Sequence, residues 1–509
     1  MKNISLLVLL GLFVTLISCG KDDESNGIDS EKPSVPLNLR ASDITKNSVT
    51  LSWDASSDNV SVKGYKVYQN GVLSIDNITQ TTINIQDLSP ETVYTFFIVS
   101  YDLAGNVSNN SNSINVSTEP DLEKPSTPIN LRTNSISANS VELIWDESSD
   151  NVGVSGYLLL MDGVEIQSNI SSNSTIVNNL NSNTNYLFNV IAYDSAQNQS
   201  DESDVLEVLT SLEFKTNLSE MGVFTGTLSN ISPATGVQLY EINSTLFTDY
   251  AAKQRLIRLP EGKMLKYDGN FLPVFPDNTL IAKTFYYNID DRDPSLGKQL
   301  IETRIFLKIS GTWEVGDYIW NASQTEAVYR ETGSEIPISW IDSDGNTQNI
   351  DYLIPSKQDC FTCHNNNGTT FPIGLKLRSM NFVPSYTSMN QLDYFANNGL
   401  LEGLPSASSV TILPDWTDDA TYDIFERGRA YIDVNCAHCH QPGGTVNNFN
   451  LDFRYETPFD DTAIFPNRGE IEARIQSTLP TYRMPQLGRT IVHDEAVAML
   501  LDYLQAIED

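Results

Sequence analysis

The sequence predicts a multidomain protein with two all-β sandwiches, a β-rich middle domain and a mainly α C-terminal region. Three patterns predict this fold class. A block of about 90 residues occurs twice near the N-terminus. Polar and apolar residues alternate in the middle of the chain, as in half-buried strands, and apolar residues recur every three or four positions near the C-terminus, as on one face of a helix. With 509 residues, 40% of them hydrophobic, the chain is long enough for three or more domains with packed cores.

Residues 1–18 have the features of a signal peptide, and an acidic tether follows at 19–32. A basic start and the apolar run Leu6–Leu16 precede Cys19, and this run is too short to span a membrane. The stretch that ends in Cys19 resembles the lipobox of bacterial lipoproteins, in which this cysteine becomes the lipidated N-terminus. The acidic residues after it resemble the tag of surface-displayed lipoproteins of Gram-negative bacteria, and a charged flexible tether has the same composition. The resemblance implies a lipid-anchored outer-membrane protein that is surface-exposed or faces the periplasm.

Residues 33–118 and 125–211 are two copies of one unit. Two pairs of aromatic residues match at an offset of 92 residues, namely Trp53 with Trp145 and Tyr94 with Tyr186. Turn-rich segments separate short alternating runs in each copy, which is the pattern of a β-sandwich. The early Trp, the later Tyr and the opening proline-containing segment resemble fibronectin type III domains. This resemblance implies spacer or adhesive modules.

Acidic residues lie in the predicted loops of both units, at Asp54, Asp58, Asp146 and Asp150. Such residues usually form solvated turns, and we expect this role here. A calcium site is the alternative, since Ca²⁺ prefers carboxylate oxygens. No pattern in the two units indicates catalysis.

The segment 213–350 predicts a separate β-rich domain. Alternating runs at 279–287 and 302–308 indicate strands, and glycine-containing turns follow them. Four basic residues cluster locally in this acidic chain, at Lys253, Arg255, Arg258 and Lys263. We expect a solvated β-surface, with binding of a partner or of haem propionates as the alternative.

The net charge of −34 bears on the class of partner. Its field repels nucleic acid and anionic lipid surfaces, so we expect no nucleic-acid partner. An acidic surface can steer a basic partner protein, and simple solubility explains the charge equally well.

The pattern C-x-x-C-H occurs twice, once in the segment 351–410 and once in the segment 411–509. The residues are Cys360, Cys363 and His364 in the first copy and Cys436, Cys439 and His440 in the second. This pattern is the attachment signature of c-type haem, with two thiols for the vinyl groups and a histidine for iron. A shared zinc site, a redox dithiol and a disulfide are the alternatives; the 73 positions between the pairs, from Cys363 to Cys436, are too wide for ordinary zinc ribbons.

The segment 411–509 resembles a small class I cytochrome c. Residues 422–434 are amphipathic and lead into Cys436, with Gly428 allowing close approach, and residues 494–507 show helical periodicity. By this resemblance His440 is the proximal haem ligand and Met484 the distal one. Packing is the alternative for Met484, because methionine is a common gap filler.

The surroundings of the first C-x-x-C-H differ from that pattern. Met380 and Met389 are candidates for a sixth iron ligand, core packing explains Met389 equally well, and an iron without a protein sixth ligand is the third possibility. Over residues 213–508 the chain resembles bacterial diheme c-type cytochromes, on the motif that leads from Ile354 into Cys360 and the one from Tyr431 into Cys436.

The resemblance implies two covalently attached haems, electron transfer and a redox partner protein. We therefore expect an exported, lipid-anchored diheme electron carrier held off the membrane by the two β-sandwiches. A diheme peroxidase and an adhesion protein with accessory haems are the alternatives. Of the other histidines, we expect His438 to point away from its own iron and His493 to be a solvated residue at a helix start.

Overall fold

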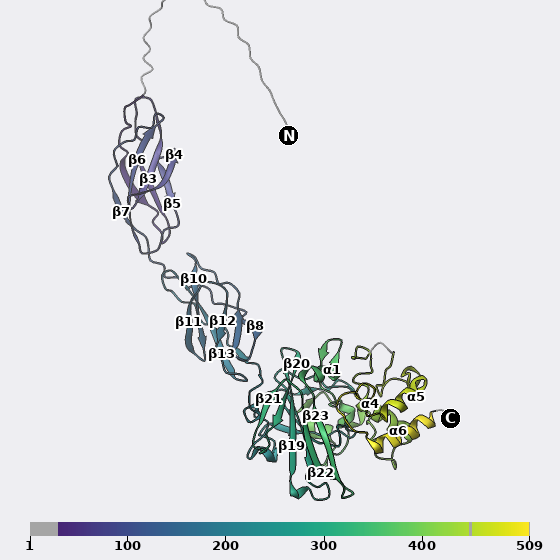
Figure 1. Ribbon diagram of the computed structural model, residues 1–509. Helices are drawn as coiled ribbons and strands as arrows, with labels where there is room; N and C mark the ends of the chain where they lie inside the picture. The colour runs from purple at the N-terminus through teal and green to yellow at the C-terminus, as the bar shows by residue number, and fades with distance from the viewer. Residues whose placement is uncertain (1–28, 447–449, 508–509) are drawn as a thin grey trace, which may run out of the picture.

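The computed structural model describes residues 29–446 and 450–507. Figure 1 shows two elongated β-sandwiches in a row, followed by a larger body that contains the remaining strands and the labelled helices. The predicted signal peptide and the predicted lipid-bearing Cys19 lie outside the described residues. Among the described helices, none is both long and apolar enough to cross a bilayer.

The first sandwich packs a three-stranded sheet, in the order β1-β2-β5, against a four-stranded sheet, in the order β4-β3-β6-β7. Alternation in β2 places Val49, Leu51 and Trp53 in the core, each at most 2% exposed. The Trp53 ring meets the Tyr65 ring edge-on at 5.3 Å. The strands are β1 (Leu37–Ser42), β2 (Val49–Asp54), β3 (Val62–Gln69), β4 (Val72–Ile78), β5 (Thr82–Ile85), β6 (Val93–Asp102) and β7 (Ile114–Ser117).

The second sandwich repeats this arrangement, with sheets in the orders β12-β9-β8 and β11-β10-β13-β14. Trp145 takes the place of Trp53 and meets Tyr157 at the same 5.3 Å. The prediction of two β-sandwiches is confirmed. The strands are β8 (Arg132–Ile136), β9 (Ser140–Ile144), β10 (Val154–Met161), β11 (Val164–Ile170), β12 (Ser174–Asn178), β13 (Asn185–Asp194) and β14 (Leu206–Leu209).

The middle of the chain forms an antiparallel six-stranded sheet, which agrees with the predicted β-rich domain. Its strands, in sheet order, are β15 (Val237–Leu239), β16 (Ala252–Arg258), β18 (Leu280–Asn288), β19 (Lys298–Ile309), β20 (Thr312–Trp320) and β21 (Ala327–Arg330). A hairpin of β22 (Ser334–Ile341) and β23 (Thr347–Ile354) then leads into the first C-x-x-C-H segment. Short 3-10 helices lie at Leu218–Met221, Leu228–Asn230, Pro294–Leu296, Ala407–Ser409 and Phe459–Asp461.

The segments after residue 213 pack together and share cores. One hydrophobic cluster runs from Tyr240 to Val410 and includes Cys360. Strand β17 (Leu265–Lys266) pairs in parallel with β26 (Leu401–Glu402), which joins the middle of the chain to the first C-x-x-C-H segment. The C-terminal segment is joined as well, because the Asp249 carboxylate accepts hydrogen bonds from the Thr490 and Ile491 N–H groups.

Six α-helices are described, and they begin after the six-stranded sheet ends. They are α1 (Lys357–Cys363), α2 (Leu377–Met380), α3 (Gln391–Asn397), α4 (Ile424–Asn435), α5 (Ile464–Ile475) and α6 (Asp494–Ala506). Loops and short strands, including β24 (Asn365–Asn366) and β25 (Thr369–Thr370), connect them. Less than half of the residues after β23 are helical, so the prediction of a mainly α C-terminal region is not supported. The chain as a whole is multidomain and β-rich.

Helices α4 and α6 pack directly against each other. Gly428 of α4 lies against Tyr503 of α6, and a Cβ at Gly428 would be 2.5 Å from the Tyr503 ring. The predicted close approach at Gly428 is confirmed, as is the helix predicted at 494–507.

Candidate metal site between the two C-x-x-C-H segments

The first motif lies on the short helix α1 and its C-terminal end. A capping box starts this helix, because the Ser356 hydroxyl accepts from the Asp359 N–H and the Asp359 carboxylate accepts from the Ser356 N–H at 2.9 Å. Seven residues later the helix ends at Cys363. Cys360 faces the hydrophobic core, while Cys363 is placed at the helix end, next to another segment of the chain.

His364 follows α1 and is held by its surroundings. Its Nδ1 lies 2.9 Å from the Phe371 carbonyl oxygen, and its ring lies 4.6 Å from the Phe306 ring. Burial disfavours the imidazolium and lowers the pKa of His364 to about 3. The side chain is therefore neutral at physiological pH.

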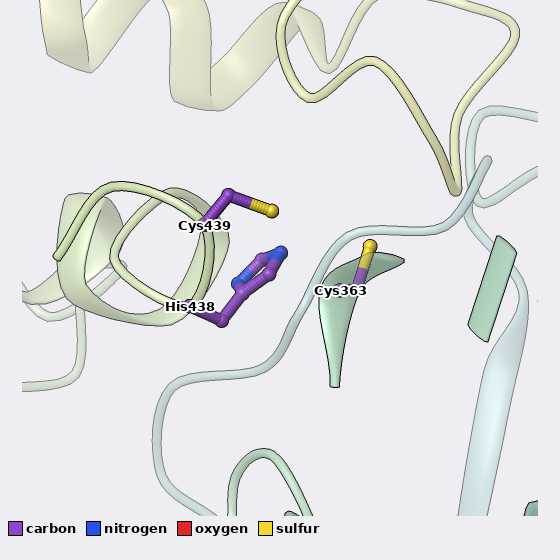
Figure 2. A group of neighbouring side chains, drawn as sticks. All are labelled: Cys363, His438 and Cys439. Atoms are coloured by element: carbon purple, nitrogen blue, oxygen red, sulfur yellow. The ribbon is translucent and has the colours of Figure 1, made fainter. Parts of the chain in front are cut away.

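The second motif begins where α4 ends. Asp423 and Glu426 form the capping box at the start of α4, and Cys436 caps its end by donating its N–H to the Ile432 carbonyl oxygen at 2.9 Å. A tight turn follows, in which the His440 N–H donates to the Cys436 carbonyl oxygen at 3.0 Å. This turn places His438 and Cys439 side by side on one surface, as Figure 2 shows.

The two motif segments contact each other directly. The Asn367 N–H donates to the Gly443 carbonyl oxygen at 2.8 Å, and the Thr445 hydroxyl donates to the Thr362 carbonyl oxygen. Gly443 has a φ of +79°, and a Cβ there would lie 2.2 Å from the Asn366 side-chain oxygen. Only glycine fits this backbone conformation and this separation.

Cys363, His438 and Cys439 meet at this contact. One potential ligand atom of each residue lies within 4.8 Å of those of the other two. Figure 2 shows the His438 ring beside the Cys439 sulfur, with the Cys363 sulfur facing them from the first segment. His438 is 8% exposed, and its Nδ1 is buried without a hydrogen-bond partner among the described residues. Two thiol sulfurs and one imidazole nitrogen at this spacing are the donor types expected of a soft-metal site.

The two thiols of this cluster differ in acidity. A hydrogen bond to Cys439, together with burial, raises the pKa of Cys363, and the same hydrogen bond lowers the pKa of Cys439. Burial raises the pKa of Cys360 and of Cys436 to about 12. These two thiols are thus neutral and are not part of the cluster.

A small cavity adjoins His438. Its volume is about 60 Å³, and its lining includes Phe371, Asp433, Ala437, His438 and Gln441. A few water molecules or a very small ligand fit a space of this size. The cavity therefore gives one side of the cluster an enclosed, partly polar neighbourhood.

Buried positive charge lies behind the first motif. Burial and neighbouring cations lower the pKa values of Lys253 and Lys283 well below the ordinary lysine value. Arg255 is 7% exposed, so the expectation of a solvated surface around Lys253 and Arg255 is wrong. Arg304 is paired with the Glu302 carboxylate, which partly balances this charge.

The predicted methionine ligands lie in different environments. Met484 is half-buried in the loop after α5, where its N–H donates to the Arg474 carbonyl oxygen at 3.1 Å. Met380 is fully buried in the core cluster that contains Cys360. Met389 is 42% exposed, and its sulfur accepts from the Asn397 amide at 3.3 Å. His440 packs against the Phe453 ring at 5.1 Å.

Sequence reasoning missed the position of His438 next to Cys363 and Cys439, since we expected it only to point away from an iron bound by its own motif. The available signal was a histidine, itself a common metal ligand, between the two cysteines. His493 lies at the start of α6 as predicted, but it is not solvated: it stacks on Phe247 at 4.0 Å, and the Tyr431 hydroxyl lies 2.9 Å from its Nδ1.

Comparison with known proteins identifies the two sandwiches. The model of the fibronectin type III domain matches residues 33–117 and 124–208. The chain therefore contains two fibronectin type III domains. The chain is also similar to a fibronectin type III pair of chicken tenascin, with 18% identity, a TM-score of 0.21, and coverage of 34% of this chain and 99% of that one.

The similar curated proteins include chitinases and exoglucanases of bacteria. Chitinase A1 of Niallia circulans is 41% identical over 190 residues, which cover 36% of this chain and 27% of the relative. Exoglucanase B of Cellulomonas fimi is 33% identical over 195 residues, which cover 37% of this chain and 18% of the relative. Chitinase Chi52 of Paenibacillus xylanexedens is 43% identical over 106 residues, which cover 21% of this chain and 20% of the relative. The chain thus spans about a quarter or less of the length of these relatives.

These matches correct the functional prediction. The relatives are chitinases and exoglucanases, so the prediction of a diheme c-type cytochrome that transfers electrons is contradicted, and so is the prediction of two covalently attached haems. In the structure, the paired motifs face each other, and one thiol of each belongs to a shared cluster. The similarity agrees with the prediction of an exported protein.

Proposed function

We propose that this protein binds one soft transition-metal ion between its two C-x-x-C-H segments, through Cys363, His438 and Cys439. The observation that supports it is the placement of two sulfurs and one imidazole, from two distant segments, within 4.8 Å of one another. The burial of His438, which is 8% exposed, is a second support, because it shields a bound ion from solvent.

The donor set favours zinc, or another soft ion such as Cu(I), over Ca²⁺ or Mg²⁺. Thiolate and imidazole are the ligands that Zn²⁺ prefers, in tetrahedral geometry with bonds of about 2.0–2.3 Å. Three protein ligands leave a fourth position for water or a small ligand, as in catalytic rather than structural zinc sites. The cavity of about 60 Å³ beside His438 gives such a ligand room.

Binding would also fasten the two segments together. The contact now rests on few hydrogen bonds, among them Asn367 to Gly443 and Thr445 to Thr362. An ion shared by Cys363 and Cys439 adds a strong link between α1 and the turn after α4, and its binding free energy becomes folding free energy of this region.

Titration of the reduced, metal-free full chain with Co²⁺, followed by competition with Zn²⁺, tests the proposal. We expect one equivalent to bind with an absorption band of thiolate-bound cobalt. Cys363→Ser, Cys439→Ser and His438→Ala should each weaken binding by at least about tenfold. Cys436→Ser is the matched control, since it removes a buried thiol of the same motif outside the cluster and should leave binding unchanged. Equal binding by the Cys363→Ser variant and the unaltered chain would reject the site.

The placement of this site in the cell is the second part of the proposal. The lipobox-like stretch around Cys19 supports a lipid anchor in the outer membrane, with the two fibronectin type III domains as spacers between anchor and C-terminal body. The extended row of domains in Figure 1 suits a spacer.

A second candidate function is attachment to polysaccharide. The similarity to Chitinase A1 and to Exoglucanase B supports it, because this chain shares with them a stretch as long as its two fibronectin type III domains. Sedimentation of the full chain with insoluble chitin or cellulose tests this candidate. Retention by neither polymer would reject it and leave the metal proposal untouched.

A further inference from the structure

Each fibronectin type III domain, together with the segment just before it, holds three aspartates at equivalent positions. A carboxylate oxygen of each lies within 4.8 Å of the other two, in the groups Asp29, Asp58 and Asp102 of the first domain and Asp121, Asp150 and Asp194 of the second. The second group follows the first at a constant offset of 92 residues. The chain therefore repeats this cluster together with the fold.

In each domain, the three aspartates come from three separate segments. Asp121 lies in the linker before the second domain, Asp150 in the loop between β9 and β10, and Asp194 at the end of β13. Asp194 is fully buried, and both its oxygens accept from Asn198, at 2.8 Å from the N–H and 2.7 Å from the side-chain amide. This carboxylate is thus fixed in place by the loop that follows it.

Asp58 and Asp150, the loop residues of the two groups, each have one carboxylate oxygen that accepts hydrogen bonds and one that has no partner among the described residues. The Asp150 Oδ2 accepts from the N–H groups of Val152 and Gly153, both at 2.8 Å, and its Oδ1 is buried without a hydrogen bond among the described residues. Asp58 does the same in the first domain, with Oδ2 bonded to Val60 and Ser61 and Oδ1 unpartnered. The local turn therefore accounts for half of each carboxylate only.

Asp121 gives the independent sign of a ligand. It is 3% exposed, and its Oδ2 is buried without a hydrogen-bond partner among the described residues. An unpartnered buried carboxylate oxygen is costly, and two further carboxylates within 4.8 Å add repulsion. A cation at the centre of the three carboxylates removes both costs.

We propose that each fibronectin type III domain binds one Ca²⁺ ion through its three aspartates. The donors are all oxygens, without sulfur or imidazole, which suits a hard cation. Three carboxylates without strict octahedral placement suit the larger and more variable coordination sphere of Ca²⁺ better than that of Mg²⁺, with water completing it. The affinity expected is that of extracellular calcium modules, with a dissociation constant of about 0.1–1 mM.

The two sites differ in one neighbour. Lys46 of the first domain lies 3.3 Å from Asp121 and 3.6 Å from Glu123, so a protein cation already stands beside the second site. Binding of Ca²⁺ there competes with this ammonium group, and we expect the second site to be the weaker one. Because Asp121 is a linker residue held by both domains, the ion at this site would also fix the junction between them.

Isothermal titration of the full, chelator-treated chain with CaCl₂ tests the proposal. We expect two ions per chain, one ion for each of Asp58→Asn and Asp150→Asn, and none for the double variant. Lys46→Met should tighten the second site by severalfold. The matched controls are Asp54→Asn and Asp146→Asn, which alter neighbouring acidic residues bonded to Asn38 and Asn130 outside the clusters and should keep two ions.

Two results of this titration would contradict the calcium proposal. Two ions retained in the Asp58→Asn, Asp150→Asn double variant, or no binding by the unaltered chain at about 5 mM Ca²⁺, would overturn the proposal. Circular dichroism of each variant checks that the β-sandwiches are intact, and the Cys363→Ser variant should bind Ca²⁺ like the unaltered chain, because the soft-metal site is a different one.

Discussion

The Cys363 sulfur lies within 4.8 Å of the Cys439 sulfur, although the two cysteines belong to different C-x-x-C-H segments. The pairing follows from a glycine-dependent contact between the loops after each motif, and His438 completes the group. This relationship makes the two motifs one site rather than two.

A side chain at Gly443 should disrupt the contact between the loops that follow the two C-x-x-C-H motifs. Gly443→Ala places a Cβ 2.2 Å from the Asn366 oxygen at a φ of +79°, and we expect a loss of about 1–3 kcal/mol in unfolding free energy of this region together with weaker Co²⁺ binding. Gly368→Ala is the control, because Gly368 has a φ of +80° with no atom within 4 Å of the added Cβ. Gly368→Ala should lower the unfolding free energy only through the strain of a Cβ at positive φ, and it should keep the metal affinity of the unaltered chain. Equal metal affinity in both variants would show that this contact does not position the site.

The α4–α6 pair should be equally sensitive to one methyl group. Gly428→Ala brings a Cβ to 2.5 Å from the Tyr503 ring, so the helices must separate, and we expect about 1–3 kcal/mol of destabilisation. Gly469→Ala in α5 meets no atom within 4 Å and should instead stabilise by about 0.5–1 kcal/mol through helix propensity. Denaturant unfolding monitored by circular dichroism distinguishes the two. Destabilisation by both variants to the same extent would contradict the packing argument.

His493 should make stability depend on pH. Burial, together with the nearby cations Lys253 and Arg489, lowers the pKa of His493 to about 4, whereas the unfolded chain binds the proton near pH 6.5. The unfolded state therefore holds more protons in between, so stability is full above about pH 6.5 and falls as the pH drops towards 4, by about 3 kcal/mol for this group.

The His493→Gln variant supplies the comparison. It should lose stability at pH 7 through the lost stacking on Phe247, but it should show a flatter dependence between pH 6.5 and 4. Parallel stability curves for the two proteins over this range would show that His493 is not the titrating group.

Export and anchoring are testable at Cys19. Cys19→Ser should move the protein from the membrane fraction to the soluble exported fraction, because the acyl chains are attached to this sulfur. Fractionation of cells followed by immunoblotting measures this. A variant that stays with the membrane would rule out the lipid anchor.

The sequence predicted local structure well and long-range placement poorly. Trp53 and Trp145 mark the two sandwiches because strand alternation and a repeated pattern are local signals. The helix at 494–507 and the close approach at Gly428 are local signals too. The sharing of one core between Tyr240 and Val410, and the meeting of Cys363 with Cys439, join residues far apart in sequence, and no period or spacing encodes them.

The functional prediction failed for a related reason. C-x-x-C-H is a five-residue pattern that specifies donors and their local spacing, but it does not specify what they bind. The contacts of Cys363 and His438 depend on how α1 meets the turn after α4, which only the fold supplies. The mainly α region was overestimated because α4 and α6 are clear in the sequence while the loops between them have no pattern.

Intact-mass spectrometry of the full exported protein tests the metal site most directly. Under native conditions in Zn²⁺, the account predicts the mass of the processed polypeptide plus one metal ion bound at Cys363, His438 and Cys439. Under denaturing conditions with a chelator, it predicts the metal-free polypeptide with Cys360, Cys363, Cys436 and Cys439 all open to alkylation. A covalent group already attached to any of these four thiols, or a native mass without bound metal, would contradict it.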